Sequence, residues 1–403
     1  MKFRKIGALV AALGIVAGFA LTGCEGSVKS GDEDTTTAAA ETEIDADAET
    51  TAQDEADADT AAATDKLNVG ILYISTKTDG GWSQGHAEGF AKAVESIGAD
   101  KVQLFEKENV PDTDAQATEN AVRTMIEEQN CGLIFATSFG YMETLERLSH
   151  DYPDVKFEHC SGFMTSENMD NYFGQIEQAR YLSGIVAGYK TESNKIGYVA
   201  AQPIPEVIRG CNAFTLGVRS VNPEATVSVK FSMTWFDPGK ETETAKALLD
   251  EGCDVLAMHQ DTPSTLKAAE DAGKFAIGYD LSAAEVVPDA YLTAPLWDWS
   301  SYYEHKMNAV MNGTWTIEES WGGMKEGLVA LDELTDLVPE EAKAAVEELE
   351  PQIAEEGNAF VFAGPLKDQD GNEVCPAGKS LSREEQMEMN YFVEGVLGQI
   401  PSN

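Results

Sequence analysis

Apolar segments suited to β-strands alternate with amphipathic segments along most of this chain. The first apolar segment, residues 67–74, has the length and β-branched content of a buried strand. The segment 89–97 then places Phe90, Val94 and Ile97 at helical spacing. Repetition of this strand–loop–helix unit is typical of a parallel sheet with helices on both faces.

The alternation runs through two successive series. The first series has further expected strands at 101–105, 132–136, 155–159 and 171–176, and the second has them at 195–200, 226–233, 254–258, 274–278 and 291–294. A chain of 403 residues is long enough for two such units. We therefore expect an α/β protein with two doubly wound parallel-sheet lobes joined by a hinge.

The N-terminal residues have the pattern of an export signal. Lys2, Arg4 and Lys5 precede an apolar stretch, residues 6–21, that is too short to span a bilayer comfortably. Residues 21–24 then read Leu-Thr-Gly-Cys, which resembles the lipobox of bacterial lipoproteins. Residues 1–23 are therefore predicted to be a cleaved lipoprotein signal peptide. Cys24 would then be a lipidated N-terminus at the extracytoplasmic face of the cell membrane.

Residues 24–65 are predicted to be a disordered acidic tether. They consist mostly of Ala, Thr, Asp, Glu and Gly, so they cannot bury enough apolar area to offset the entropy lost on ordering. The formal net charge of the whole chain is −42, and most of it falls after the tether. Such acidity argues against nucleic acid as a partner, because phosphate binding needs clustered Lys and Arg.

The two predicted lobes are each built from two stretches of the chain. Lobe 1 is expected to comprise residues 66–176 and 296–318, and lobe 2 residues 177–295 and 319–403. The chain then crosses between the lobes three times, and these crossings are expected to form the hinge. Two such lobes on a tethered, exported protein favour a periplasmic-binding-protein fold that closes on a ligand.

The loops that follow the expected strands carry the candidate ligand-binding residues, because ligands of open α/β sheets bind outside the carboxyl ends of the strands. In residues 78–88, two glycines precede Trp82, which either forms a wall of a small-molecule site or packs in the core. The other candidates are Asp79, Ser138, Phe139 and Tyr141 in lobe 1, and Glu206, Trp235, Asp261 and Asp280 in lobe 2.

Aromatic rings from both lobes, with carboxylates between them, indicate a planar ligand rich in hydrogen-bond donors. Stacking on an aromatic side chain contributes about 1–3 kcal/mol per base, and carboxylates accept hydrogen bonds from ring N–H or amino groups. A purine fits this description, whereas phosphate or sulfate does not. Asp261 and Asp280 have a structural alternative, since each could cap the helix after it. We expect no metal and no cofactor.

Six segments are similar to the basic membrane protein (BMP) family of substrate-binding lipoproteins, which includes purine nucleoside receptors. They are residues 79–89, 137–143, 203–210, 212–217, 234–240 and 362–365, which read DGGWSQGHAEG, TSFGYME, PIPEVIRG, NAFTLG, TWFDPGK and FAGP. The similarity extends over residues 66–401. It implies a type I periplasmic-binding-protein fold and a receptor that delivers its ligand to an ABC permease and ATPase complex.

The resemblance also implies roles for individual residues. Trp82 matches the family's first stacking position, Trp235 matches the second, where nucleoside receptors typically have Phe, and Asp280 matches an acidic position. The chain departs from the family in lacking a ribose-contacting lysine near 291–299 and in having Asp79-Gly80 where an acid–amide pair is expected. Both departures favour a free nucleobase such as adenine over a nucleoside.

Two other functional classes fit the same residues. A ligand-sensing receptor would use the same closing lobes but dock on a membrane signalling protein. A surface nucleosidase would use Asp79, Asp261 or Asp280 as a general acid or base. The interpretation favoured by the sequence is a binding protein rather than an enzyme.

Overall fold

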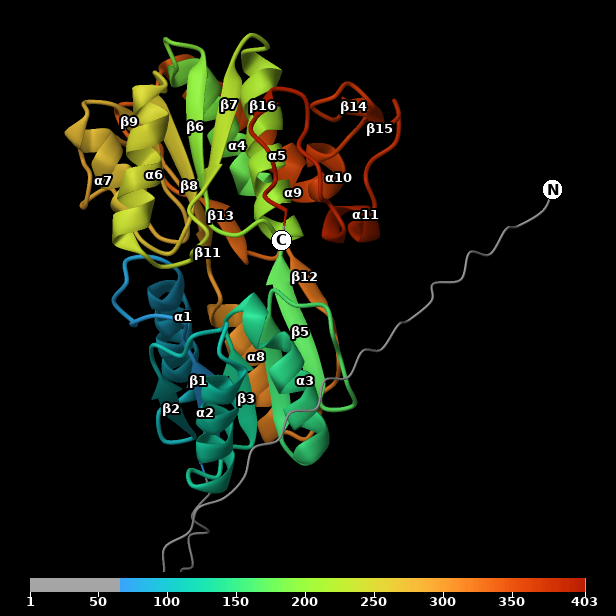
Figure 1. The fold of residues 1–403 in the computed structure, drawn as a ribbon. Helices are drawn as coiled ribbons and strands as arrows, with labels where there is room; N and C mark the ends of the chain where they lie inside the picture. The colour runs from blue at the N-terminus through green and yellow to red at the C-terminus, as the bar shows by residue number, and fades with distance from the viewer. Residues whose placement is uncertain (1–65, 403) are drawn as a thin grey trace, which may run out of the picture. The chain divides into compact units, whose positions relative to one another are not determined.

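A computed structural model describes residues 66–402, all of which belong to one compact unit of the chain. It contains two six-stranded sheets, and every pairing within them is parallel (Figure 1). The prediction of two doubly wound α/β lobes is therefore confirmed. The predicted signal peptide (1–23), the lipidation site Cys24 and the tether lie outside the described residues.

The sheet of lobe 1 has the strand order β12-β5-β4-β3-β1-β2. Its strands are β1 (Leu67–Leu72), β2 (Val102–Lys107), β3 (Leu133–Ala136), β4 (Lys156–Cys160), β5 (Met169–Gly174) and β12 (Ser320–Gly322). Its helices are α1 (Trp82–Ile97), α2 (Ala115–Glu127), the short η1 (Phe139–Tyr141), α3 (Met142–Asp151) and α8 (Ser300–Met311). Every residue of β3 and β5 is buried, as expected for strands covered on both faces.

The sheet of lobe 2 has the order β10-β9-β8-β6-β7-β16. Its strands are β6 (Lys195–Ala200), β7 (Thr226–Phe231), β8 (Val255–His259), β9 (Phe275–Ile277), β10 (Tyr291–Thr293) and β16 (Val396–Leu397). The accompanying helices are α4 (Glu177–Lys190), α5 (Pro205–Val221), α6 (Pro238–Asp250), α7 (Ser264–Asp271), α9 (Glu340–Glu356), α10 (Asn358–Val361) and α11 (Arg383–Met387). Asp237 caps α6 by accepting hydrogen bonds from two backbone N–H groups, and Pro238 occupies the first helical position.

Three crossings connect the two sheets. The first leads from β5 into α4, and the second leads from β10 into β11 (Pro295–Trp297). The third leaves β12 for β13 (Val329–Leu331), which pairs antiparallel with β11 between the sheets (Figure 1). The first and third crossings are hydrogen-bonded to each other, because the Gln175 backbone N–H donates to Gly322 O at 2.7 Å and its side-chain amide donates to Trp321 O at 3.0 Å.

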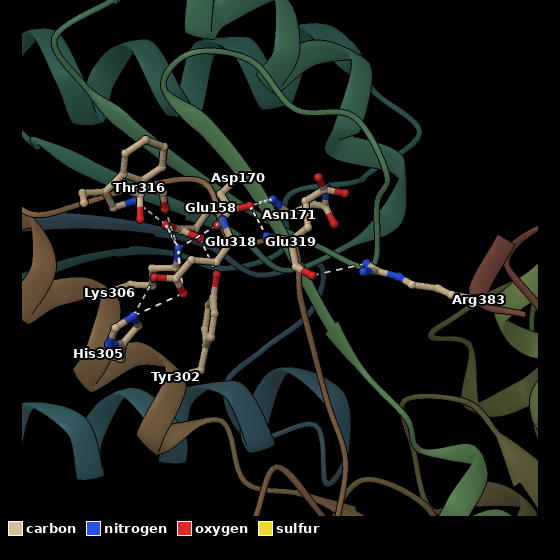
Figure 2. Close-up of polar contacts among 11 residues, drawn as sticks. Glu158, Asp170, Asn171, Tyr302, His305, Lys306, Thr316, Glu318, Glu319 and Arg383 are labelled. Carbon is tan, nitrogen blue, oxygen red and sulfur yellow. Dashed lines mark hydrogen bonds and ion pairs between the residues drawn. The ribbon is translucent and has the colours of Figure 1, made fainter. Parts of the chain in front are cut away.

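The third crossing lies later in the chain than the sequence predicts. The sequence pattern assigns residues from 319 onward to lobe 2, but β12 pairs with β5 in the lobe 1 sheet. The loop before β12 is fixed to lobe 1 by Asp170, whose carboxylate accepts the backbone N–H groups of Glu318 and Glu319 at 2.9 and 3.0 Å (Figure 2). A three-residue strand held by tertiary contacts has too short an apolar run to be recognised from sequence.

A buried lysine supports the same loop from the lobe 1 side. Lys306 on α8 is fully buried, and its Nζ lies 2.6 Å from Asp170 and 3.7 Å from Glu158 (Figure 2). It also donates to Thr316 O at 3.1 Å. From lobe 2, Arg383 donates to Glu319 O at 3.3 Å, so the loop 316–319 is contacted by both lobes.

The C-terminal residues complete lobe 2 through long-range hydrogen bonds. A hairpin pairs β14 (Leu366–Lys367) with β15 (Glu373–Cys375), and β16 adds an edge strand beside β7. Asn212 on α5 is fully buried, donates to Tyr391 O at 2.8 Å and accepts Val393 N–H at 2.9 Å. No helix of residues 66–402 is long and apolar enough to span a bilayer.

Replacing Asn212 with alanine is expected to lower the free energy of unfolding by about 1–2 kcal/mol, because a buried carbonyl and a buried N–H lose their partner. Urea unfolding measures the loss. Asn308→Ala, which changes an asparagine on α8 that has no side-chain hydrogen bond among the described residues, is the control. Equal effects of the two substitutions would contradict a specific role of Asn212.

Candidate functional site

The loops after the strands of both sheets meet at one cavity. Ten residues line it: Ile74, Trp82, Ser138, Phe139 and Ser161 from lobe 1, and Glu206, Trp235, His259, Asp261 and Tyr279 from lobe 2. The cavity encloses about 310 Å³ between protein atoms, including the part open to solvent. The lining therefore brings together six of the nine residues predicted from sequence.

Trp82 is both a cavity wall and a packed residue. Its side chain is 8 % exposed, and its indole N–H donates to Thr137 O at 2.6 Å. His86 packs edge-on against the indole at 4.3 Å between ring centroids, and Trp299 does so at 5.8 Å. Trp82 therefore lines the cavity and is also packed against its neighbours, and these contacts fix the orientation of its ring.

Trp235 forms the aromatic wall contributed by lobe 2. It is only partly buried, and its ring centroid lies 6.2 Å from that of His259. Its carbonyl oxygen accepts the Asp261 N–H at 3.1 Å, which ties the two loops together. The cavity thus has one indole from each lobe.

Glu206 and His259 form a buried polar pair in the lobe 2 wall. His259 Nε2 lies 3.3 Å from Glu206 Oε1. Burial, reinforced by the positive charge of Arg180, lowers the pKa of His259 to about 4. Burial alone would raise the pKa of Glu206, but the hydrogen bond with His259 and the positive charge of Arg209 outweigh burial and lower the pKa. Neutral His259 therefore donates to ionised Glu206, and Glu206 Oε2 has no partner among the described residues.

Asp261 supplies a second carboxylate oxygen without a partner. Its side chain is buried, and Oδ2 has no hydrogen bond within the described part of the chain. Burial and the neighbouring Asp280 raise the pKa of Asp261 well above its usual range. A Cβ atom at Gly81 would lie 2.4 Å from Asp261 O, so only glycine allows this close approach of the two lobes.

Three predicted residues do not line this cavity. Asp79 accepts the backbone N–H groups of Gly81, Ser83 and Gln84 at 3.0–3.1 Å, so its carboxylate stabilises the start of α1. The Tyr141 hydroxyl is buried and donates to Val110 O at 2.6 Å. Asp280 lies beside the cavity-lining Tyr279, and neither of its oxygens has a partner among the described residues. It is therefore not a helix cap.

Four lining residues were missed by the sequence analysis. Ile74, Ser161, His259 and Tyr279 all lie at or just after the end of a strand. The rule that strand ends face the ligand could have found them, but an isolated histidine or isoleucine carries no chemical signal of its own. Residues 66–402 hold no group of three His, Cys, Asp or Glu side chains arranged to bind a metal ion.

A buried glutamate near this wall predicts a pH-dependent stability. Glu241 accepts hydrogen bonds from Asp237 N–H at 3.0 Å and from the Thr262 hydroxyl, and burial raises its pKa from 4.5 to about 7. The native state therefore binds this proton more tightly than the unfolded state. The free energy of unfolding should consequently fall as pH rises from about 4.5 through about 7.

In Glu241→Gln, the free energy of unfolding is expected to fall by about 1–2 kcal/mol less than in wild type between about pH 5 and about pH 8, because the titrating group is gone. Urea unfolding at the two pH values measures the difference. Glu243→Gln, on the exposed side of α6, should leave the fall unchanged. Parallel pH profiles for the wild type and Glu241→Gln would refute the prediction.

Comparison with known proteins places the chain in a family. A family model described as ABC transporter substrate-binding protein PnrA-like, named Bmp, matches residues 66–360. A purine-binding protein of Brucella abortus is 38 % identical over 341 residues, which cover 85 % of this chain and 96 % of that protein. A putative ABC transporter glucose-binding protein of Haloferax volcanii is 39 % identical over 336 residues, covering 83 % and 82 %.

Solved structures support the fold independently. A solute-binding protein of an ABC transporter system from Aeropyrum pernix superposes with a TM-score of 0.64 at 18 % identity, covering 79 % of this chain and 95 % of that one. The type I periplasmic-binding-protein fold expected from the family resemblance is thereby confirmed. From the matched family and these relatives, the chain belongs to the PnrA-like (BMP) family of ABC transporter substrate-binding proteins.

Proposed function

We propose that this protein captures a purine nucleobase, adenine or a close relative, and delivers it to an ABC permease. One observation carries the proposal. A single cavity has an indole from each lobe, Trp82 and Trp235, and two buried carboxyl oxygens without partners among the described residues, on Glu206 and Asp261. Flat rings stack on indoles, and the polar ring and amino groups of the base supply hydrogen-bond partners for the two carboxyl groups.

The segment 291–299 favours a base over a nucleoside as the ligand. No lysine occurs in the segment 291–299, and its tryptophans Trp297 and Trp299 are buried and stacked with ring centroids 4.5 Å apart. The purine-binding relative supports the ligand class.

Glucose is a second candidate, because the Haloferax volcanii relative is 39 % identical and is described as a putative glucose-binding protein. Sugar hydroxyls also donate to carboxylates, and the sugar face packs on indoles. Two indoles facing one small cavity favour the aromatic ligand.

The ligand that copurifies with the protein tests the proposal. The protein is purified folded and then denatured, and the released small molecule is identified by mass. Adenine, adenosine, guanosine and glucose are then titrated separately by calorimetry into protein freed of this molecule. Adenine should bind at least about tenfold more tightly than adenosine. Release of glucose, or adenosine binding far more tightly than adenine, would overturn the proposal.

The proposed role also includes a lipid anchor at Cys24 and the absence of catalysis. Radiolabelled palmitate should be incorporated into the full chain and not into Cys24→Ser.

Incubation with nucleosides should release no free base, and release would favour the nucleosidase. Asp79 is poorly placed for acid–base chemistry, because backbone N–H groups occupy its carboxylate. Loss of purine uptake on deletion of the gene would favour transport, and intact uptake would favour the sensor.

A further inference from the structure

A glycine of lobe 1 lies directly against the main chain of lobe 2. A Cβ atom added to Gly81 would lie 2.4 Å from Asp261 O and 2.8 Å from Asp261 C. Non-bonded carbon atoms attract most strongly at about 3.5–4.0 Å, so this added atom would overlap the lobe 2 main chain. The adjacent Gly80 is also close to lobe 2, since a Cβ atom there would lie 3.2 Å from Pro263 Cδ. Position 81 therefore has no room for a side chain while the lobes lie as they do.

The lobe 1 loop at this contact is held by its own hydrogen bonds. Gly81 N–H donates to Asp79 Oδ1 at 3.0 Å, and Gly81 O accepts Gly85 N–H at 2.9 Å in the first turn of α1. Asp79 Oδ2 also accepts Ser83 N–H at 3.0 Å. Moving Gly81 away from Asp261 within lobe 1 would break such bonds and leave donors and acceptors unpaired.

The lobe 2 main chain on the other side of the contact is fixed as well. Asp261 N–H donates to Trp235 O at 3.1 Å. The preceding residue, Gln260, is fully buried, and its side-chain amide donates to Ser232 Oγ at 2.8 Å and accepts the Thr265 hydroxyl at 3.0 Å. Neither loop can therefore yield without losing hydrogen bonds. Rotation of the lobes about the three crossings separates the two loops and leaves these bonds intact.

The same contact connects the two aromatic walls of the cavity. Gly81 directly precedes Trp82, whose indole N–H donates to Thr137 O at 2.6 Å. On the other side, the N–H of Asp261 is bonded to the carbonyl of Trp235. The approach of Gly81 to Asp261 therefore limits how closely the two indoles approach each other.

We infer that Gly81 is a specificity-determining residue, because the absence of its side chain lets the lobes close until Trp82 and Trp235 both contact a flat ring. The inference rests on the proposed function for its ligand. A side chain at position 81 meets Asp261 O before closure is complete, so the lobes stop with a wider cavity between them. A flat ring then stacks on one indole at most, whereas a thicker pyranose ring still reaches both.

Adenine binding by the full chain tests the inference in Gly81→Ala, with Gly85→Ala as the matched control. Gly85 is buried on α1 and also faces lobe 2, but a Cβ atom there would lie 3.7 Å from Leu281 Cδ2, an ordinary contact distance. By calorimetry, Gly81→Ala should bind adenine at least about tenfold more weakly than wild type, because one stacking face is lost. Gly85→Ala should bind like wild type. Unchanged affinity in Gly81→Ala, or an equal loss in Gly85→Ala, would contradict the inference.

The extent of closure is measured directly as the distance between two spin labels. The labels are attached at Glu95→Cys on α1 and Lys267→Cys on α7, two exposed positions on different lobes. The five cysteines of the described residues are buried, and Cys24→Ser removes the remaining one. Saturating adenine should bring wild type and Gly85→Ala to the same distance and leave Gly81→Ala at a longer one. Equal distances in all three would overturn the inference even if the affinity falls, because a defect confined to lobe 1 does not alter closure.

The same distances measured with other probes separate this inference from the proposed function. The probes are glucose and the small-molecule extract released from denatured wild type. If wild type closes on either of these but not on adenine, the proposed function fails, while the distance in Gly81→Ala with that probe still decides the role of Gly81. Where glucose also binds wild type, its affinity should fall less in Gly81→Ala than that of adenine. An equal fall would overturn the assignment of specificity to this residue.

Folding of the ligand-free variants is also informative. Gly81→Ala should unfold at nearly the same urea concentration as wild type, because opening of the lobes relieves the overlap with Asp261. Failure of Gly81→Ala to fold, with Gly85→Ala folded, would contradict the inference, because the overlap would then not be confined to the closed lobes.

Discussion

Replacing Lys306 with methionine is expected to lower the free energy of unfolding by about 3–5 kcal/mol, because a buried ion cluster loses its buried cation. The Lys306 amine lies 2.6 Å from Asp170 and 3.7 Å from Glu158, and all three side chains are fully buried (Figure 2). Methionine fills similar volume but leaves two carboxylates uncompensated. Urea unfolding followed by circular dichroism measures the loss.

The same variant has a predictable pH dependence. Burial raises the pKa of Glu158 to about 7, and Lys306 opposes this rise. Without the amine, the native state holds a proton on Glu158 still more tightly than the unfolded state does. Native stability then falls further as pH rises, so the deficit of Lys306→Met should be larger at about pH 8 than at about pH 5.

Lys343→Met is the matched control. Lys343 pairs with Glu340 at 2.9 Å on the outside of α9, where Glu340 is 86 % exposed. An exposed pair contributes less than about 1 kcal/mol, so this variant should be close to wild type. Comparable losses in the two lysine variants would show that the buried cluster has no special role.

Trp235→Ala should weaken adenine binding by about 1–3 kcal/mol, or roughly 5- to 150-fold, because one of the two stacking faces is removed. Trp235 is the cleaner target of the two indoles, since it is only partly buried. Trp82 also donates to Thr137 O and packs on His86, so its removal would disturb folding. Titration calorimetry measures the affinity, and Trp235→Phe should retain most of it.

Phe236→Ala provides the control for this prediction. Phe236 is the next residue, is 39 % exposed and does not line the cavity. Its removal should leave adenine affinity close to wild type. If Phe236→Ala weakens binding as much as Trp235→Ala, the effect comes from the loop and not from stacking on the indole.

Local sequence patterns account for the elements and for the face on which the site lies. Segments such as β1 and β6 are short apolar runs followed by a loop and an amphipathic helix, and this order is enough to predict two doubly wound sheets. Strand ends of a parallel sheet lie at one edge, so the sequence alone predicts Trp82, Ser138, Glu206 and Asp261 as neighbours.

The sequence did not predict which polar side chains of a strand-end loop face the cavity, because this depends on the backbone path of the loop. Asp79 lies three residues before Trp82, yet its oxygens accept backbone N–H groups at the start of α1 instead of facing the cavity. Tyr141 likewise points its hydroxyl at Val110 O. A carboxylate or hydroxyl group in a strand-end loop can either face the cavity or hydrogen-bond to the backbone. The backbone path of the loop decides which of the two occurs.

The sequence by itself determined the fold class, the family and the edge of the sheets at which the cavity lies, because these depend on short-range periodicity and on contiguous motifs. Tertiary structure alone decided that β12 joins β5, that Lys306 meets Asp170 across 136 residues and that Arg180 lies against Tyr279. Those contacts join segments that lie far apart in the chain. Whether a buried charged side chain has a partner is decided only when these segments pack together, so local sequence patterns do not reveal it.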